Sequence, residues 1–374
     1  MKAAAVFPTE HRFDLVDHPE PHLSSASEVK MRMLDVGICG TDKEIVNFQY
    51  GTPPPGSPYL IIGHESLGEV VETGKDVTKL KPGDLAVATV RRPCDVAGCA
   101  ACRAGRPDFC YTMQYTERGI LKRHGYMTEW TVEDAAYVNP VPRSLRDVAV
   151  LVEPLTIAEK AVEQLWEVQR RLPWALAVKP GEPPGAGRNA LVLGAGPVGL
   201  LGAMKLVMEG FDTTVYSRTG RVGDVAGLVH GIGAKFVHAE TTGVAALAAQ
   251  IGNIDVVYEA VGASSLAFEA IRYLGVNGVF IFTGVPGRKG PVPVDTDQLM
   301  RDHVLKNQIV FGTVNASADH FRRAIADIGA FAQRWPRALS GIISHRIPLE
   351  QAAAALSGRV EGIKNVIAIG GPAE

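Results

Sequence analysis

The segment Leu191-Val192-Leu193-Gly194-Ala195-Gly196-Pro197-Val198-Gly199 decides the fold of this chain. It contains the pattern G-x-G-x-x-G between an apolar run that predicts a strand and a stretch that predicts a helix. Gly194 permits a tight turn, Gly196 lets a pyrophosphate approach the backbone, and Gly199 lets helix and strand pack closely. The first N–H groups of such a helix bind phosphates. The pattern therefore predicts a dinucleotide site at Gly194, Gly196, Pro197, Val198 and Gly199; the alternative is a glycine-rich structural turn.

The residues around this loop alternate between predicted strands and helices. We expect strands at 190–193, 213–216, 256–258 and 279–282, and a helix at 198–209. Apolar strands that alternate with helices are typical of a parallel sheet covered on both faces. The region 189–312 is therefore predicted to be a dinucleotide-binding domain of the Rossmann type.

The end of the second predicted strand reads Val215-Tyr216-Ser217-Arg218-Thr219. Enzymes that use NAD usually have an acidic residue there, which binds the ribose hydroxyls. This segment has no acid, and Arg218 is suited to pair with a 2′-phosphate while Ser217 donates a hydrogen bond. We therefore expect NADP as the cofactor, with NAD as a second possibility. The alternative is that Arg218 is a solvated surface residue.

The segments on either side have a different texture. Residues 1 to about 150 contain short apolar runs separated by Gly- and Pro-rich turns, which predicts an irregular, mostly β domain. A helix is predicted over 154–171, before a Pro- and Gly-rich linker at 180–187. After Gly312 the predicted secondary structure is mixed again, so this C-terminal segment is a candidate to pack with the first domain.

The chain has five cysteines, and four of them, Cys94, Cys99, Cys102 and Cys110, are closely spaced. Four thiolates at short spacing suit a closed tetrahedral zinc site, which leaves no position open and is therefore structural. Four unrelated buried cysteines or two disulfides are the alternatives, and disulfides are disfavoured in a reducing cytoplasm.

Four further residues are competent zinc ligands: Cys39, His64, Glu65 and Glu153. Three protein ligands would leave one position for a substrate, as in catalytic zinc sites. Their spacing alone leaves open that each is only a structural residue.

Composition excludes several functions. The 374 residues are enough for two domains, and 46% are hydrophobic. The net charge of −2 and the absence of a long basic run exclude nucleic acid and anionic membranes as expected partners. The N-terminus makes a poor signal peptide, and no run approaches the roughly 20 apolar residues of a membrane helix. We therefore expect a cytoplasmic protein.

The chain resembles the zinc-containing medium-chain alcohol dehydrogenases over essentially its whole length. The motifs occur in that superfamily's order: G-I-C-G-T-D (37–42), G-H-E (63–65), the four-cysteine segment, E-P-L (153–155) and G-A-G-P-V-G (194–199). Other segments resemble its glucose 1-dehydrogenase family: R-R-P-C (91–94), R-P-D-F-C (106–110), E-R-G-I (117–120), H-G-Y-M (124–127) and V-N-A (314–316). The resemblance implies an α/β fold in which a GroES-like β domain contains an inserted Rossmann domain, divided as 1–188, 189–312 and 313–374.

The resemblance also implies roles for individual residues. Cys39 and His64 would bind the catalytic zinc, and Glu65 would be a ligand or close neighbour that exchanges with Glu153. The four-cysteine site would bring the count to two zinc ions per chain. Contacts to a sugar would come from Thr41, Glu117, Glu153 and Asn315. The nicotinamide would be lined by Thr283, Gly284, Val285, Thr313, Val314 and Asn315.

The implied reaction oxidises an aldose, such as glucose, at C1 to the lactone. Zinc acts as a Lewis acid, Thr41 is the first step of proton release, and a hydride passes to the nicotinamide. A homo-oligomer, dimer or tetramer, is expected. A polyol, cyclitol or secondary alcohol dehydrogenase is the alternative enzyme, and a non-catalytic relative would need a degraded metal site.

Three departures from the family pattern affect these expectations. Four residues separate Cys94 from Cys99 where two are usual, which concerns the shape of the loop. Val90 and Ile157 replace polar residues found in some glucose enzymes, so the identity of the sugar substrate is left open. Thr219 replaces a frequent second Arg, which favours use of both NADP and NAD.

Overall fold

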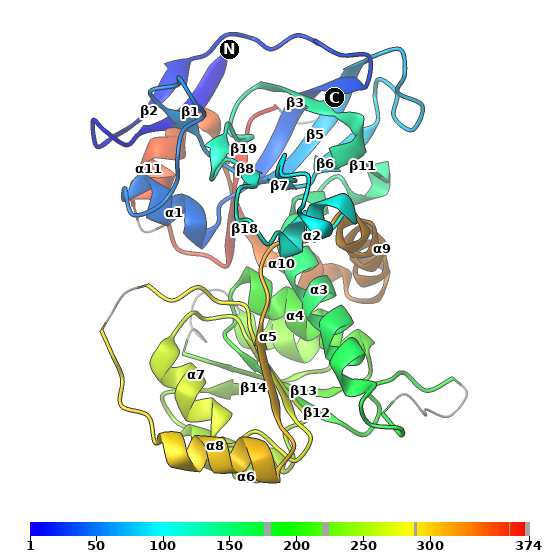
Figure 1. Ribbon diagram of the computed structural model, residues 1–374, viewed down its shortest axis with the longest axis vertical. Helices are drawn as coiled ribbons and strands as arrows, with labels where there is room; N and C mark the ends of the chain where they lie inside the picture. The colour runs from blue at the N-terminus through cyan, green and yellow to red at the C-terminus, as the bar shows by residue number, and fades with distance from the viewer. Residues whose placement is uncertain (176–180, 219–223, 288–289, 359, 371–374) are drawn as a thin grey trace. The chain divides into compact units, whose positions relative to one another are not determined.

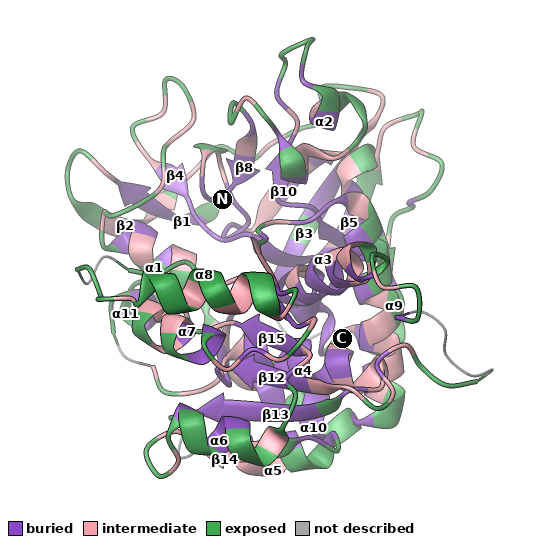
Figure 2. Cartoon of the chain, turned by 60° about the horizontal axis from the view of Figure 1, so that its bottom comes forward, coloured by how far each residue is buried: buried purple, intermediate pink, exposed green. Residues whose placement is uncertain are grey.

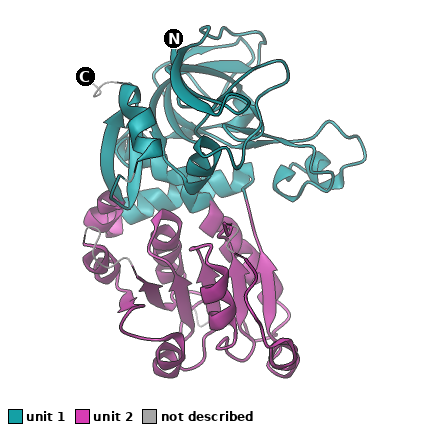
Figure 3. Cartoon of the chain, turned by 90° about the vertical axis from the view of Figure 1, so that its left-hand side faces the viewer, with its two compact units in different colours: residues 1–156, 315–332, 343–374 teal, residues 157–314, 333–342 magenta. Residues whose placement is uncertain are grey.

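The computed structural model describes residues 1–175, 181–218, 224–287, 290–358 and 360–370. They form two compact units, coloured separately in Figure 3. The first unit consists of residues 1–156, 315–332 and 343–374, and the second of residues 157–314 and 333–342. The domain division 1–188, 189–312 and 313–374 remains a proposal beside these contact-based units.

The second unit is built on a parallel sheet of six strands in the order β14-β13-β12-β15-β16-β17. Figure 1 labels β12, β13 and β14 of this sheet. From β12 the chain adds strands on one side, then crosses to the other, which creates a switch point at the carboxyl ends of β12 and β15. The strands are β12 (Asn189–Leu193), β13 (Asp212–Ser217), β14 (Lys235–His238), β15 (Val256–Glu259), β16 (Val279–Phe282) and β17 (Ile309–Gly312). The predicted parallel sheet is confirmed.

Helices cover this sheet and close its core. Leu193, Val257 and Phe280 of the strands pack with Leu247 and Ile271 of the helices, all nearly inaccessible to solvent. The buried colour of β12, β13 and β15 in Figure 2 contrasts with the exposed face of α8. The helices are α4 (Pro197–Met208), α5 (Val225–Gly231), α6 (Val244–Ile251), α7 (Ser264–Ile271), α8 (Thr296–Leu305) and α10 (Pro336–Ile342). The long helix α3 (Val152–Gln169) begins in the first unit and continues in the second.

The first unit is mostly β, as predicted. Its largest sheet runs β11-β6-β5-β3-β19-β18, with β10 also paired to β3. Strand β19 pairs antiparallel with β3, where Val366 lies opposite Gly37, so the C-terminal tail completes this sheet. The unit also contains two three-stranded sheets, β2-β1-β4 and β7-β8-β9. The predicted architecture, a mostly β domain that contains an inserted Rossmann domain, is therefore confirmed.

Most strands and helices of the first unit are short, and the longest are β3 and α9. The strands are β1 (Lys2–Phe7), β2 (Arg12–Asp17), β3 (Glu28–Gly37), β4 (Leu60–Ile61), β5 (Glu65–Thr73), β6 (Leu85–Ala88), β7 (Arg91–Arg92), β8 (Thr116–Arg118), β9 (Lys122–Arg123), β10 (Trp130–Asp134), β11 (Val138–Val141), β18 (Ile343–Pro348) and β19 (Lys364–Ala368). The α-helices are α1 (Gly40–Val46), α2 (Ala100–Arg103), α9 (Ala318–Arg334) and α11 (Ala352–Ser357). None of the helices in the described ranges combines the length and apolar character that crossing a bilayer requires.

Candidate active site

A cavity of about 620 Å³ lies at the carboxyl ends of the strands of the parallel sheet. Gly194 and Gly196 after β12 line it, together with Ala260 after β15. Gly194 has φ of 102°, which favours glycine, and its N–H donates to the Tyr216 carbonyl at 2.9 Å. A Cβ atom on Gly196 would meet no protein atom within 4 Å, so a ligand can approach this backbone. The cavity is at the switch point where such folds bind dinucleotides.

Helix α4 begins directly after this glycine turn. Pro197 is its first residue, with Gly196 as the N-cap, so Val198 and Gly199 follow in the first turn. A Cβ atom on Gly199 would collide with the Gly194 carbonyl oxygen, which explains why this position needs glycine. The helix therefore starts close to the strand end and presents its first N–H groups there.

The residues predicted to read the ribose also line this cavity. Ser217 is buried at the end of β13, whereas Arg218 is exposed. Among the described residues, Arg218 has no ion-pair partner, so its guanidinium is available to a phosphate. Glu269 of α7 lines the same cavity and is the acid that a phosphate there would have to avoid. The prediction for Thr219 lies outside the described residues.

The segments predicted to line the nicotinamide are held by neighbouring side chains. The Thr283 hydroxyl donates to the Glu259 carbonyl at 2.7 Å, and the Gly284 N–H donates to the Glu259 carboxylate at 3.2 Å. Gln164 donates to the Thr313 hydroxyl at 3.0 Å. The ammonium of buried Lys160 donates to the Val314 carbonyl at 2.9 Å, while the Val314 and Val285 side chains remain exposed.

In the first unit, Cys39, His64 and Glu65 come together as a group of potential metal ligands. Their ligand atoms all lie within 4.8 Å of one another. Asp42 organises the group, because its carboxylate accepts from the Cys39 N–H at 2.8 Å and from the Gly63 N–H at 3.2 Å. The same carboxylate lies 3.5 Å from His64 Nδ1. Burial disfavours the charged imidazole, but Asp42 and Cys39 outweigh it and raise the pKa of His64 above its usual value.

Glu65 is buried in β5 opposite Gly37 of β3. A Cβ atom at position 37 would overlap the Glu65 carboxylate, so glycine is required for this approach. The carboxylate forms an ion pair with Lys364 of β19, whose ammonium also donates to the Ile38 carbonyl at 2.9 Å. Lys364 is itself buried. The C-terminal strand thus supplies the counter-charge of a group formed by N-terminal residues.

Glu153 and Thr41 are near this group without being part of it. Desolvation raises the pKa of Glu153 to about 7, although His64 opposes this and Glu65 adds to it. The carboxyl of Glu153 is therefore within electrostatic range of both. Thr41 lies at the start of α1, with its hydroxyl 3.9 Å from the Cys39 sulfur.

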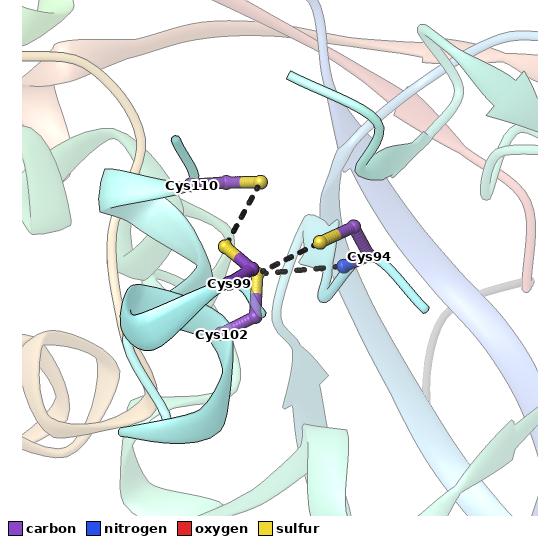
Figure 4. A group of neighbouring side chains, drawn as sticks. All are labelled: Cys94, Cys99, Cys102 and Cys110. Carbon is purple, nitrogen blue, oxygen red and sulfur yellow. Dashed lines mark hydrogen bonds between the residues drawn. The ribbon is translucent and has the colours of Figure 1, made fainter. Parts of the chain in front are cut away.

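The four remaining cysteines face one another around α2 (Figure 4). The sulfur atoms of Cys94 and Cys102 are 3.7 Å apart, and those of Cys99 and Cys110 are 3.8 Å apart. A tetrahedral site with Zn–S bonds of about 2.3 Å has sulfur–sulfur distances of about 3.8 Å, whereas a disulfide needs about 2.05 Å. All four thiols are free. The arrangement therefore fits a closed zinc site, and the group at Cys39 fits a site with one open position.

Two of the residues predicted to contact a sugar, Glu117 and Asn315, are hydrogen-bonded to each other. Glu117 of β8 is only 4% exposed and lies opposite Arg91 of β7. Asn315 donates from Nδ2 to Glu117 Oε1 at 2.8 Å, and Arg91 donates from Nε to the same oxygen at 3.0 Å. Glu117 is thus a buried, partnered carboxylate.

Sequence reasoning assigned no role to Asp42, Lys364 and Arg91, although each contacts a predicted site residue. Asp42 could have been found, because it follows Cys39 at the spacing of a residue that caps the start of a helix. Arg91 belongs to the R-R-P-C motif, which does not indicate its partner. Lys364 has no local signal, since its partner Glu65 is at the other end of the chain.

Comparisons with known proteins agree with this fold. The family model described as alcohol dehydrogenase GroES-like domain matches residues 25–143, and the one described as glucose dehydrogenase C-terminus matches residues 146–369. A glucose 1-dehydrogenase of Methanocella arvoryzae is 42% identical over 373 residues, covering 99% of this chain and 100% of that protein. One of Thermoproteus tenax is 38% identical over 370 residues, with 99% of each chain covered.

A solved structure supports the same relationship. Haloferax mediterranei glucose dehydrogenase, in complex with NADP, Zn and gluconolactone, superposes with a TM-score of 0.85. It is 31% identical in sequence, and the superposition covers 99% of both chains.

Proposed function

The chain belongs to the glucose dehydrogenase family of the zinc-containing medium-chain dehydrogenases. We therefore propose that it oxidises a glucose-like aldose at C1 to the lactone. The observation that carries the proposal is the group formed by Cys39, His64 and Glu65, in a chain that aligns with a relative whose structure contains NADP, Zn and gluconolactone. The hydride acceptor is NADP, with NAD as a second substrate.

The catalytic zinc would be held by Cys39 and His64, with Glu65 as a ligand or close neighbour that exchanges with Glu153. Zinc supplies Lewis acidity, which lowers the pKa of a bound hydroxyl group. Asp42 orients the His64 ring, as partners of metal-binding histidines commonly do. The ammonium of Lys364 compensates the negative charge of the Glu65 carboxylate. The Thr41 hydroxyl is the first group to accept the proton that leaves the substrate.

The second zinc would be held by Cys94, Cys99, Cys102 and Cys110. This segment has a small core of its own, made of the cysteines with Ala101 and Tyr115. A metal that binds only the folded state adds its binding free energy to folding, so we assign this zinc a structural role.

The cofactor would lie in the cavity of the second unit. Exposed Arg218 offers a charge-assisted contact to a 2′-phosphate, and the backbone at Gly196 gives the pyrophosphate room to approach. Among the described residues that line the cavity, Arg218 supplies the positive charge and Glu269 opposes it, which favours a moderate preference for NADP over NAD.

The protein is proposed to be a homo-oligomer. Strand β17 is an edge of the parallel sheet, and the side chains of Met300, Val304 and Leu305 on α8 are 63–69% exposed. Large exposed apolar side chains and an edge strand are typical of a surface that a second copy covers. A two-fold dimer through this face is the simplest closed arrangement.

The experiment that tests the function is a panel of aldoses, polyols and simple alcohols, each with NADP and with NAD. We expect the highest kcat/KM with an aldose and NADP, and a lactone as product. Efficient turnover of polyols or secondary alcohols without any turnover of aldoses would contradict the proposal and favour the alternative enzyme.

A further inference from the structure

Arg91 is buried between the four-cysteine segment and the predicted sugar-binding pair. Its side chain is 5% exposed, and its guanidinium lies 3.6 Å from the centre of the Tyr115 ring. Nη1 donates to the carbonyls of Pro107 and Asp108, each at 3.4 Å, within the segment that ends at Cys110. Ring, carbonyls and strand pairing together hold the guanidinium in one orientation.

The other side of this guanidinium meets Glu117. Nε and Nη2 of Arg91 are each 3.0 Å from Oε1 of Glu117, and the amide of Asn315 reaches the same oxygen at 2.8 Å. Within the described ranges, the donors that contact this carboxylate all lie at Oε1 and none lies at Oε2. A carboxylate has lone pairs on both oxygens, so Oε2 keeps its capacity to accept hydrogen bonds.

We infer that Arg91 is a positioning residue for the sugar: it fixes Oε1 of Glu117, so that Oε2 accepts a hydrogen bond from a substrate hydroxyl. This inference rests on the proposed function, because it needs Glu117 to bind an aldose. It also links the zinc-binding segment to substrate affinity, since the carbonyls that hold Arg91 belong to that segment.

The roles of the guanidinium cannot be filled by an ammonium. Arginine offers a planar fork of donors and a flat face for stacking, whereas lysine is a compact charge. A lysine at position 91 could keep the charge beside Glu117 but could not reach both the carboxylate and the two carbonyls. Arg91→Lys is therefore a mild change in charge and a large change in geometry.

Arg92 provides a matched control. It is the adjacent residue of the same strand, is 3% exposed, and forms its ion pair with Glu133 instead of Glu117. Arg92→Lys disturbs a buried arginine–glutamate pair without touching Glu117. Any effect that comes only from loss of a buried guanidinium should appear in both variants.

The experiment compares wild type, Arg91→Lys, Arg92→Lys, Glu117→Gln and the double variant Arg91→Lys/Glu117→Gln, using glucose and NADP. We expect Arg91→Lys to raise the KM for glucose at least fivefold, with the KM for NADP and the zinc content unchanged. Arg92→Lys should leave the KM for glucose within twofold of wild type. In the Glu117→Gln background, Arg91→Lys should cause little further rise, because the arginine acts through that carboxylate.

Three outcomes would overturn the inference: an unchanged KM in Arg91→Lys, equal rises in both lysine variants, or a full additional rise in the Glu117→Gln background. A wild-type enzyme that oxidises no aldose would instead refute the proposed function, and the inference with it. The two failures are distinguished by the wild-type measurement alone.

Discussion

Asn315 donates a hydrogen bond from Nδ2 to Oε1 of Glu117 across 2.8 Å, although 198 residues separate them in the sequence. Asn315 adopts φ of 59°, in the left-handed region that asparagine tolerates better than most residues. Its backbone conformation and its amide contact therefore constrain each other. A change at either residue should act partly through the other.

Replacing Glu117 tests the substrate. If Glu117 accepts hydrogen bonds from sugar hydroxyls, Glu117→Ala should lower kcat/KM for the best aldose at least tenfold. A factor of ten corresponds to about 1.4 kcal/mol, within the range of a charged hydrogen bond. Activity on a small alcohol, where measurable, should hardly change because the zinc site is intact. Equal losses on both substrates would show that Glu117 serves the fold and not the sugar.

Metal content and stability distinguish the proposed roles of the group at Cys39 and of the four-cysteine group. Cys39→Ala or His64→Ala should abolish activity and remove one zinc while the thermal unfolding temperature stays near that of wild type. Cys99→Ala or Cys102→Ala should instead lower the stability, because the segment loses its metal. Metal analysis and thermal unfolding on the same samples check this. Active protein without zinc would contradict it.

Arg218 should discriminate between the cofactors. Loss of one charge-assisted contact costs roughly 1.5–3 kcal/mol, so Arg218→Ala should raise the KM for NADP about tenfold or more. The KM for NAD should change little. Arg301→Ala, which removes another exposed arginine of the same unit, is the control and should affect neither cofactor. Equal effects of Arg218→Ala on both cofactors would show that it does not bind the 2′-phosphate.

Stability should fall in mild acid because of His124. Burial, together with the charges of His18 and Arg118, lowers the pKa of His124 to about 4. Its Nδ1 accepts a hydrogen bond from the Ile61 N–H at 3.1 Å, which requires an unprotonated nitrogen. The unfolded histidine binds a proton near pH 6.5 and the folded one does not, so stability is full above pH 6.5 and decreases toward pH 4.

A shift of this size corresponds to about 3 kcal/mol, and because the ring keeps some solvent contact we expect about half of it. Urea unfolding at a series of pH values measures the effect. His124→Gln should flatten the decrease between pH 6.5 and 4.5, whereas His345→Gln, at an exposed position, should not. An unchanged pH profile in His124→Gln would disprove this origin.

The exposed face of α8 should determine the oligomeric state. Introducing charge with Val304→Asp and Leu305→Asp should convert the oligomer to a smaller species, because buried unpaired charges are costly. Light scattering during size-exclusion chromatography measures the mass. Lys235→Asp, on strand β14 at the opposite edge of the same sheet, is the control. A wild-type monomer would contradict the proposed association.

The sequence alone determined those features that depend on short spacing. The turn from β12 into α4 needs three glycines at fixed positions, and the four-cysteine group needs its cysteines close together in the chain, so both can be read from short stretches of sequence. Alternation of apolar strands and helices likewise predicted the parallel sheet. These patterns reflect local geometry, which distant parts of the chain do not alter.

Only the tertiary structure decided which distant residues become partners. Lys364 reaches Glu65 because β19 pairs with β3, and Asn315 reaches Glu117 because the chain returns to the first unit after β17. The burial of Glu117 and its bond to Arg91 depend on the register of β7 against β8. No local sequence pattern identifies the partners of Lys364, Asn315 or Arg91. Those partners depend on how strands and segments far apart in the chain come together in the folded protein.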